Sequence, residues 1–376
     1  MPSFTSNALA VPGSGIRRVH ELAITLPDVL MLAVGEPDVP VAPHVLAAAS
    51  EAWLADETDY TANGGLIELR SAIASRLEGF DAGPDQVWVT PGGTEAIFLA
   101  LGLVLSPGDE VLVPDPGYTT FTMAPRMLHA TPVPYRLEAA RGFLPEAADL
   151  DALVTSRTRA IIVNSPSNPL GVVFPERVVA DLVAFAQRHD LWVLSDEVYE
   201  AFTYGAPHVP PARFDPARTL TVRSFSKTYA LTGGRVGYLV TPPGRGDVLR
   251  NFQEALISCV NTPAQRAAIA ALTGPQDAVR AAADRYREHL EAATALLDDR
   301  GIGYLRPQGA FYLWIDVSHA SDGGVAGWAE RFLLEQRVAV APGSAFGAAG
   351  EGWIRVCVAA DRATLLEGLS RLPAPR

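Results

Sequence analysis

The sequence predicts an α/β protein with a mainly parallel sheet that has helices on both faces, followed by a smaller α+β domain. Two observations carry this prediction. Between residues 85 and 241, short apolar segments alternate with amphipathic segments, which is typical of strands joined by crossover helices. From residue 262 onward, long helical patterns are mixed with a few short strand candidates, as in an α+β unit.

The strand candidates of the larger part are short apolar runs rich in β-branched residues. They lie at 87–90, 110–113, 160–163, 191–195, 220–223 and 236–240. Apolar residues recur at helical spacing at 94–105 and 176–189, between strand candidates. Because the strands are almost wholly apolar, we expect them to be buried between two layers of helices.

In the C-terminal part, residues 262–300 have a helical pattern with a break near Gly274-Pro275. Strand candidates follow at 312–316, 338–341 and 353–358, with a helix at 325–336 and a last helix after Asp361. The first forty residues are rich in Pro and Gly and are predicted to be irregular. We therefore expect an N-terminal segment 1–40 packing on the small domain, a large domain 41–270 and a small domain 271–376.

Composition excludes several classes of protein. No apolar run approaches the ~20 residues of a membrane span, and residues 1–10 lack the pattern of a signal peptide. A net charge of −12 argues against nucleic acid and anionic membranes as partners. Cys259 and Cys357 form no redox or metal motif, so we expect a cytoplasmic protein. His20 lacks the second histidine of a zinc helix, and no metal is predicted.

Lys227 is the only lysine among 30 basic Lys and Arg residues. A bias toward arginine explains the general depletion but not the one lysine that remains. A guanidinium group stays protonated and cannot act as a nucleophile, whereas an amine can form a Schiff base. The sequence therefore marks Lys227 as a candidate for covalent catalysis.

Polar segments follow the predicted strands at one edge of the sheet, where open α/β sheets bind ligands. A Schiff-base cofactor with a phosphate and a pyridine ring would find its partners in them. Gly93 and Thr94 open a helix whose N–H groups suit a phosphate. The other candidates are Ser224, Ser226 and Arg235 for the phosphate, Asp196 for the ring nitrogen, Asn168 and Tyr199 for the ring oxygen, and Tyr118 for the ring face.

With these residues in place, the chain resembles a fold-type I pyridoxal-phosphate-dependent aminotransferase of class I/II over nearly its whole length. The matching segments are 35–38 (GEPD), 60–70, 93–96 (GTEA), 164–171, 195–199 (SDEVY), 224–238 around Lys227, and 353–355 (WIR). The lysine segment and the Asn-Pro segment are specific, whereas the glycine pair alone is weak. Leu170 and Gly234 depart from the common pattern, but neither change removes a group that the chemistry needs.

The resemblance implies a role for each matching residue. Lys227 binds pyridoxal 5'-phosphate covalently and moves the α-proton, while Arg355 binds the substrate α-carboxylate near Gly35 and Asn168. Tyr60 resembles the tyrosine that reaches the phosphate of a partner subunit, which implies a homodimer. The implied reaction moves an amino group between an amino acid and a 2-oxo acid. A lyase, β-replacement or cyclising reaction on the same cofactor stays open as an alternative, with a non-catalytic ligand sensor as a third.

Overall fold

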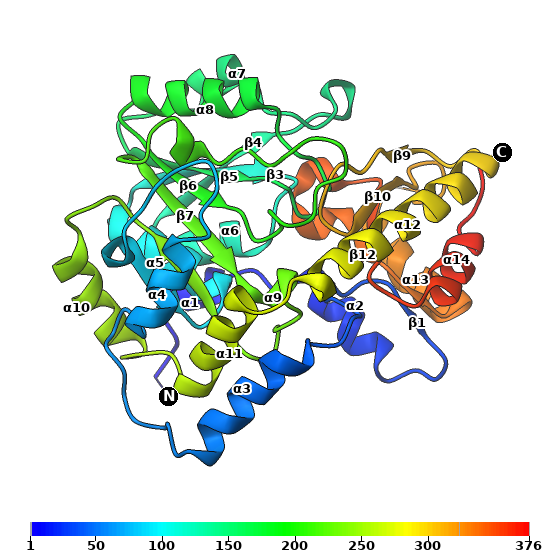
Figure 1. Cartoon of the computed structure of the whole chain (residues 1–376). Coiled ribbons are helices and arrows are strands. Elements are labelled where there is room, and N and C mark those ends of the chain that lie inside the picture. Colours follow the sequence, from blue (N-terminus) through cyan, green and yellow to red (C-terminus); the bar gives the residue numbers. More distant parts are fainter. Residues whose placement is uncertain (1, 323, 376) are drawn as a thin grey trace.

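The computed structural model describes residues 2–322 and 324–375, and a seven-stranded sheet forms its centre (Figure 1). The strand order is β2-β8-β7-β6-β5-β3-β4. β8 is antiparallel to β2 and β7, and the other neighbours are parallel, so the predicted mainly parallel sheet is confirmed. The strands are β2 (Val87–Thr90), β3 (Glu110–Asp115), β4 (Thr131–Arg136), β5 (Thr158–Asn164), β6 (Trp192–Asp196), β7 (Thr219–Ser224) and β8 (Gly237–Val240).

Helices cover both faces of this sheet, and the alternation along β5 shows why. Ile161 and Val163 belong to a buried cluster with residues of α8, whereas Ala160 and Ile162 belong to another cluster with residues of α5 and α6. In Figure 1, α8 lies above the sheet and α5 below it. The helices of this part are α3 (Pro43–Leu54), α4 (Ile67–Ala74), α5 (Gly93–Val104), α6 (Thr120–Met127), α7 (Ala147–Asp151), α8 (Glu176–Arg188), α9 (Phe225–Thr228), α10 (Gly246–Leu256) and α11 (Thr262–Thr273).

β4 was not predicted, because its sequence TPVPYR contains Pro132 and Pro134. Each proline removes a backbone N–H, which usually argues against a strand. Both are tolerated here because β4 is an edge strand that pairs with β3 alone. β4 was therefore missed because the local sequence does not show that this strand lies at the edge of the sheet.

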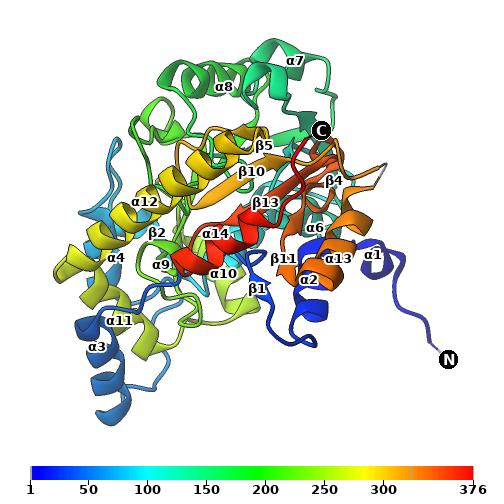
Figure 2. The ribbon, with the colours of Figure 1, turned by 90° about the vertical axis from the view of Figure 1, so that its right-hand side faces the viewer.

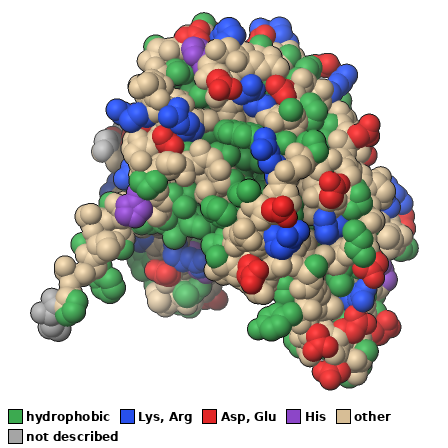
Figure 3. All heavy atoms as spheres, turned by 90° about the vertical axis from the view of Figure 1, so that its left-hand side faces the viewer, with side chains coloured by type: hydrophobic (Ala, Val, Ile, Leu, Met, Phe, Trp, Pro, Cys, Tyr) green, Lys and Arg blue, Asp and Glu red, His purple; other side chains and the backbone are tan. Residues whose placement is uncertain are grey.

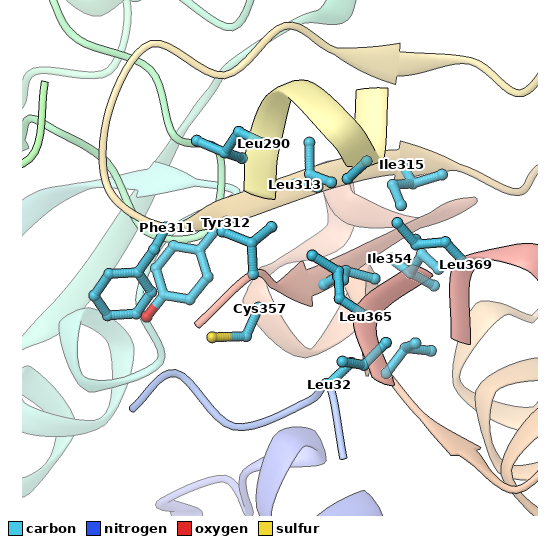
Figure 4. Packing of buried hydrophobic residues seen from close by; sticks show 14 of the residues in the cluster. Leu32, Leu290, Phe311, Tyr312, Leu313, Ile315, Ile354, Cys357, Leu365 and Leu369 are labelled. Carbon is cyan, nitrogen blue, oxygen red and sulfur yellow. The ribbon is translucent and has the colours of Figure 1, made fainter. Parts of the chain in front are cut away.

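A four-stranded antiparallel sheet, in the order β12-β13-β10-β9, forms the core of the smaller part. Figure 2 shows α12 and α14 lying across it, and Figure 4 shows Leu313, Ile354 and Leu365 meeting in the cluster between them. The elements are α12 (Asp277–Asp299), β9 (Tyr304–Leu305), β10 (Tyr312–Asp316), α13 (Val325–Gln336), β11 (Val338–Ala339), β12 (Ala341–Pro342), β13 (Trp353–Cys357) and α14 (Arg362–Ser370). The predicted single strand at 338–341 is wrong, because β11 pairs with β1 (Leu30–Met31) and β12 pairs with β13.

The N-terminal region contains α1 (Ser6–Ala10), α2 (Gly15–Ala23) and β1 (Leu30–Met31), so the prediction that it is irregular is wrong. The Ser14 hydroxyl caps α2 by accepting the N–H of Arg17 at 3.3 Å. α2 packs on α13, β11 and β12, while α1 packs on α6. The domain bounds at residues 40 and 270 stay a prediction. Within the described ranges, no helix is both long enough and apolar enough to cross a bilayer.

Candidate active site

A cavity of about 780 Å³ lies where the carboxyl ends of β6 and β7 meet the N-terminus of α5 and the small sheet. Parallel strands end at the same edge, which brings together residues that are far apart in the sequence. Every predicted site residue except Tyr60 lines this cavity: Gly35, Gly93, Thr94, Tyr118, Asn168, Asp196, Tyr199, Ser224, Ser226, Lys227, Arg235 and Arg355. Tyr60 lies outside it with an exposed fraction of 88%.

Lys227 lies on the short helix α9, directly after β7. Its Nζ donates a hydrogen bond to the carbonyl oxygen of Gly35 at 2.7 Å. Burial disfavours the ammonium form and lowers the pKa of Lys227 to about 8. A substantial fraction of the amine is therefore neutral at mildly alkaline pH, which is the form that attacks a carbonyl group.

Asp196 ends β6 and is almost fully buried, with an exposed fraction of 3%. Its Oδ1 accepts the N–H of Val198 at 3.2 Å, and its carbonyl oxygen accepts Nδ2 of Asn164 at 3.1 Å. Burial raises the pKa of Asp196 to about 7. In this buried position, the charged form of the carboxyl group would be stabilised by a cationic partner, such as a protonated ring nitrogen.

The N-terminus of α5 and Arg235 form a corner suited to a dianion. Gly92 caps α5 at φ +87°, and a Cβ there would lie 2.5 Å from Nη2 of Arg235, so the backbone and the guanidinium lie in close contact. Among the described residues, the Arg235 guanidinium donates to no carboxylate and to two carbonyl oxygens, those of Thr232 at 2.8 Å and Pro91 at 3.1 Å. The Ser224 hydroxyl accepts the N–H of Ser226 at 3.1 Å. Free N–H groups, hydroxyls and a cation are the groups that bind phosphate in proteins.

Arg355 lies on β13 with an exposed fraction of 2%. Its Nη1 donates to Oδ1 of Asn168 at 2.8 Å and its Nη2 donates to the carbonyl oxygen of Ala33 at 2.6 Å. Its Nε has no hydrogen-bond partner within residues 2–322 and 324–375. The guanidinium lies 4.3 Å from the centre of the Tyr312 ring. None of the described carboxylates forms a salt bridge with it. A buried cation without an anion is costly, which indicates a site for a carboxylate.

Sequence reasoning missed Tyr312, which the strand pattern of β10 presented as an apolar residue. Its hydroxyl lies 2.6 Å from that of Tyr199, and both residues line the cavity. A Cβ on Gly35 would lie 2.1 Å from Oη of Tyr312, so only glycine fits there. Tyr118 lines the same cavity and packs edge-to-face on Phe121 at 5.7 Å.

Further lining residues were also missed, and many of them belong to α2, α6 or the caps of these helices rather than to strand ends. From these two helices and their caps come Ser14, Ile16, Arg17, His20, Thr119, Thr120 and Met123. The others are Val34, Glu36, Ile97 of α5, Val198 and Thr232. The signal for α2 was present: a serine cap precedes an amphipathic run. In the described part of the chain, no group of three or more His, Cys, Asp or Glu side chains could hold a metal ion.

Comparisons with known proteins identify the family of the chain. The family model described as aminotransferase class I and II matches residues 27–372. The chain is 34% identical to an aspartate aminotransferase of Pyrococcus horikoshii, with 97% of this chain and 95% of that protein covered. It is also 34% identical to aromatic-amino-acid aminotransferase 2 of Thermococcus litoralis, with 96% and 94% covered.

A solved structure of aspartate aminotransferase from Thermus thermophilus aligns with a TM-score of 0.93 and 34% identity, with 99% of both chains covered. The fold-type I architecture and the aminotransferase activity expected from the sequence are confirmed by these matches. The chain therefore belongs to the class I and II aminotransferase family.

Proposed function

We propose that the cavity binds pyridoxal 5'-phosphate through Lys227 and uses it to move an amino group between an L-amino acid and a 2-oxo acid. The observation that carries the proposal is a charge pattern. One buried amine with a lowered pKa shares a cavity with two arginines, Arg235 and Arg355, that have no carboxylate partner among the described residues. A phosphate group and a substrate carboxylate are anions that could pair with Arg235 and Arg355, respectively.

The residues present fit this cofactor. Gly93, Thr94, Ser224, Ser226 and Arg235 would hold the phosphate, since they supply N–H groups, hydroxyls and a cation at one corner. Four other lining residues would hold the ring: Asp196 would pair with the ring nitrogen, Asn168 and Tyr199 with the ring oxygen, and Tyr118 would cover a ring face. When bound, the cofactor supplies an electron sink for the charge left when a substrate loses its α-proton.

Arg355 orients the substrate. Its guanidinium carbon lies 4.3 Å from the centre of the Tyr312 ring and its Nη1 donates to Asn168, so these contacts position the guanidinium for an α-carboxylate, with Gly35 lining the same cavity. Lys227 would accept the proton from the substrate Cα and hold it at Nζ, since it lines the same cavity as Arg355. A pKa near 8 suits this shuttle, because the amine changes protonation state close to neutral pH.

We propose that the protein is a homodimer. Large hydrophobic side chains remain exposed on α3 and α10, among them Trp53, Val248 and Leu256. Figure 3 shows the face seen from the left of Figure 1, where α10 lies, and hydrophobic side chains gather in its hollow. The exposed Tyr60 is proposed to reach the phosphate in the partner subunit. The free thiols of Cys259 and Cys357 support the proposal of a cytoplasmic location.

The amino donor is left open at this level. The relatives named above are an aspartate aminotransferase and an aromatic-amino-acid aminotransferase, so their names point to different amino donors. The proposed substrates are therefore L-amino acids and 2-oxo acids as a class, and the side-chain pocket decides among them.

Borohydride reduction of the holoenzyme, followed by peptide mapping, tests the covalent link. We expect one pyridoxyl group on the peptide that contains Lys227 and a change of the cofactor spectrum when an L-amino acid is added alone. Lys227→Arg is the matched control, because it keeps the charge but removes the nucleophilic amine. Label outside the Lys227 peptide, or normal turnover by Lys227→Arg, would refute the proposal.

A further inference from the structure

The cavity extends beyond the groups assigned to cofactor and α-carboxylate. One wall of this extension comes from α2 and its cap, with Ser14, Ile16, Arg17 and His20. The facing wall comes from the start of α6 and from α5, with Thr119, Thr120, Met123 and Ile97. None of these residues has a role in the function proposed above.

The fold places this extension next to Arg355. β12 pairs with β13 so that Ala341 lies opposite Arg355, and α2 packs on β12. The carbonyl oxygen of Ala33, two residues after β1, accepts a hydrogen bond from Nη2 of Arg355. Arg355 and Lys227 line the same cavity as residues of α2 and α6, so the space between these helices is available to the side chain of a substrate whose α-carboxylate binds Arg355.

Arg17 is the charged group of this extension that lacks a counter-ion. Six charged side chains line the whole cavity: Arg17, Glu36, Asp196, Lys227, Arg235 and Arg355. Glu36 accepts a hydrogen bond from the hydroxyl of Thr232. Asp196, Lys227, Arg235 and Arg355 are assigned to the cofactor or the α-carboxylate in the proposed function. Among the described residues, no salt bridge or side-chain hydrogen bond involves the Arg17 guanidinium, whereas its neighbour Arg18 pairs with Glu330 of α13 at 2.8 Å.

His20 strengthens the polar character of the same wall. It follows Arg17 by three positions, so both side chains lie on one face of α2, while Val19 and Ala23 are buried. The Nδ1 of His20 is buried and has no hydrogen-bond partner. Opposite, Thr119 and Thr120 offer two more hydroxyl groups. A cation with polar neighbours and no anion is a binding site for a carboxylate.

We propose that Arg17 is a specificity-determining residue that binds the side-chain carboxylate of the substrate, so the enzyme prefers acidic amino acids and 2-oxo diacids. The proposal rests on the proposed function. In this arrangement Arg355 and Arg17 bind the two ends of a dicarboxylate, and His20 and the threonine hydroxyls supply further hydrogen bonds. The Arg17 side chain is exposed, so an aromatic or aliphatic substrate gains no ion pair from it, whereas a dicarboxylate does.

Single-turnover reactions of the holoenzyme with L-aspartate, L-glutamate and L-alanine test the proposal. In Arg17→Gln, the ratio of kcat/KM for acidic over neutral donors should fall roughly 10- to 100-fold, as expected when a hydrogen bond between charged groups is lost. Arg17→Lys should recover part of the ratio, because it restores the charge without the fork. Arg18→Gln is the matched control: it removes the same charge one residue away, on the side of α2 that faces α13.

Equilibrium binding gives a second readout that does not depend on turnover. Succinate should bind the holoenzyme more weakly in Arg17→Gln by a similar factor, with no such change in Arg18→Gln, while butyrate should bind both variants alike. If Arg17→Gln leaves both the ratio of kcat/KM values and the affinity for succinate unchanged, the inference about Arg17 is wrong while the proposed function stands. If no amino acid alters the cofactor spectrum of the unmodified enzyme, the proposed function fails instead.

Discussion

Replacement of Arg355 by lysine tests how the site orients its substrate. Two of the three guanidinium nitrogens already donate to Asn168 and Ala33, and the guanidinium carbon lies 4.3 Å from the centre of the Tyr312 ring. An ammonium group cannot keep these anchors and also present two parallel N–H groups to a carboxylate. Loss of one side of a desolvated charge pair costs about 2–5 kcal/mol. Arg355→Lys should therefore lower kcat/KM for amino acids by about 30- to 5,000-fold.

The assay is the single-turnover reaction of the holoenzyme with L-alanine, followed by the cofactor spectrum, and with ethylamine, which lacks the carboxylate. The defect should be large for alanine and small for ethylamine. Arg362→Lys, at an exposed position on α14, is the matched control. A thermal unfolding curve checks that Arg355→Lys is folded. An equal loss with both substrates, or no loss with alanine, would show that Arg355 does not bind the α-carboxylate.

Three further predictions concern the electron sink, the lysine and the assembly. Asp196→Asn should fold normally but slow α-proton removal by several orders of magnitude, and an unchanged single-turnover rate would exclude Asp196 as the ring-nitrogen partner. Without cofactor, the folded pKa of Lys227 of about 8 lies below its usual 10.5, so between these pH values the unfolded chain binds more protons and the free energy of unfolding rises with pH. When the free energy of unfolding is measured by urea at several pH values, its rise with pH should be smaller in Lys227→Met by up to about 3 kcal/mol. An equal rise in both proteins would show that the amine of Lys227 is not buried. Mixing inactive Lys227→Ala with an inactive Tyr60→Phe variant should restore activity, because one site of the mixed dimer is intact; no recovery despite subunit exchange would contradict the shared site.

The alternation of apolar and amphipathic segments determined most of the larger part. Strands at 87–90 and 312–316 and the helix at 325–336 have the predicted bounds, because burial on both faces or a regular helical stripe leaves a strong local pattern. Where the pattern is set by a neighbour, local reasoning failed. Residues 338–341 are apolar throughout, yet they divide between two sheets because their partners β1 and β13 lie on different sides.

For the site, the sequence determined the chemistry that the strand ends carry. Lys227, Asp196 and Asn168 could be named because an amine, a carboxyl and an amide at strand ends suit one cofactor. Their convergence in one cavity follows from the parallel order of β5, β6 and β7. Sequence could not assign Tyr312 or Arg17, because their roles come from contacts between elements that are distant in the chain.

The division has a physical reason. Residue type fixes what a group can do: only an amine forms a Schiff base, and only glycine fits beside Oη of Tyr312 at position 35. Environment fixes how the group behaves, and environment is made by packing. Burial lowers the pKa of Lys227 to about 8 and raises that of Asp196 to about 7, and burial arises only when the two sheets and α2 close around the cavity. The sequence thus determined the reacting groups, and the tertiary structure decided their protonation, their partners and the wall that selects the substrate.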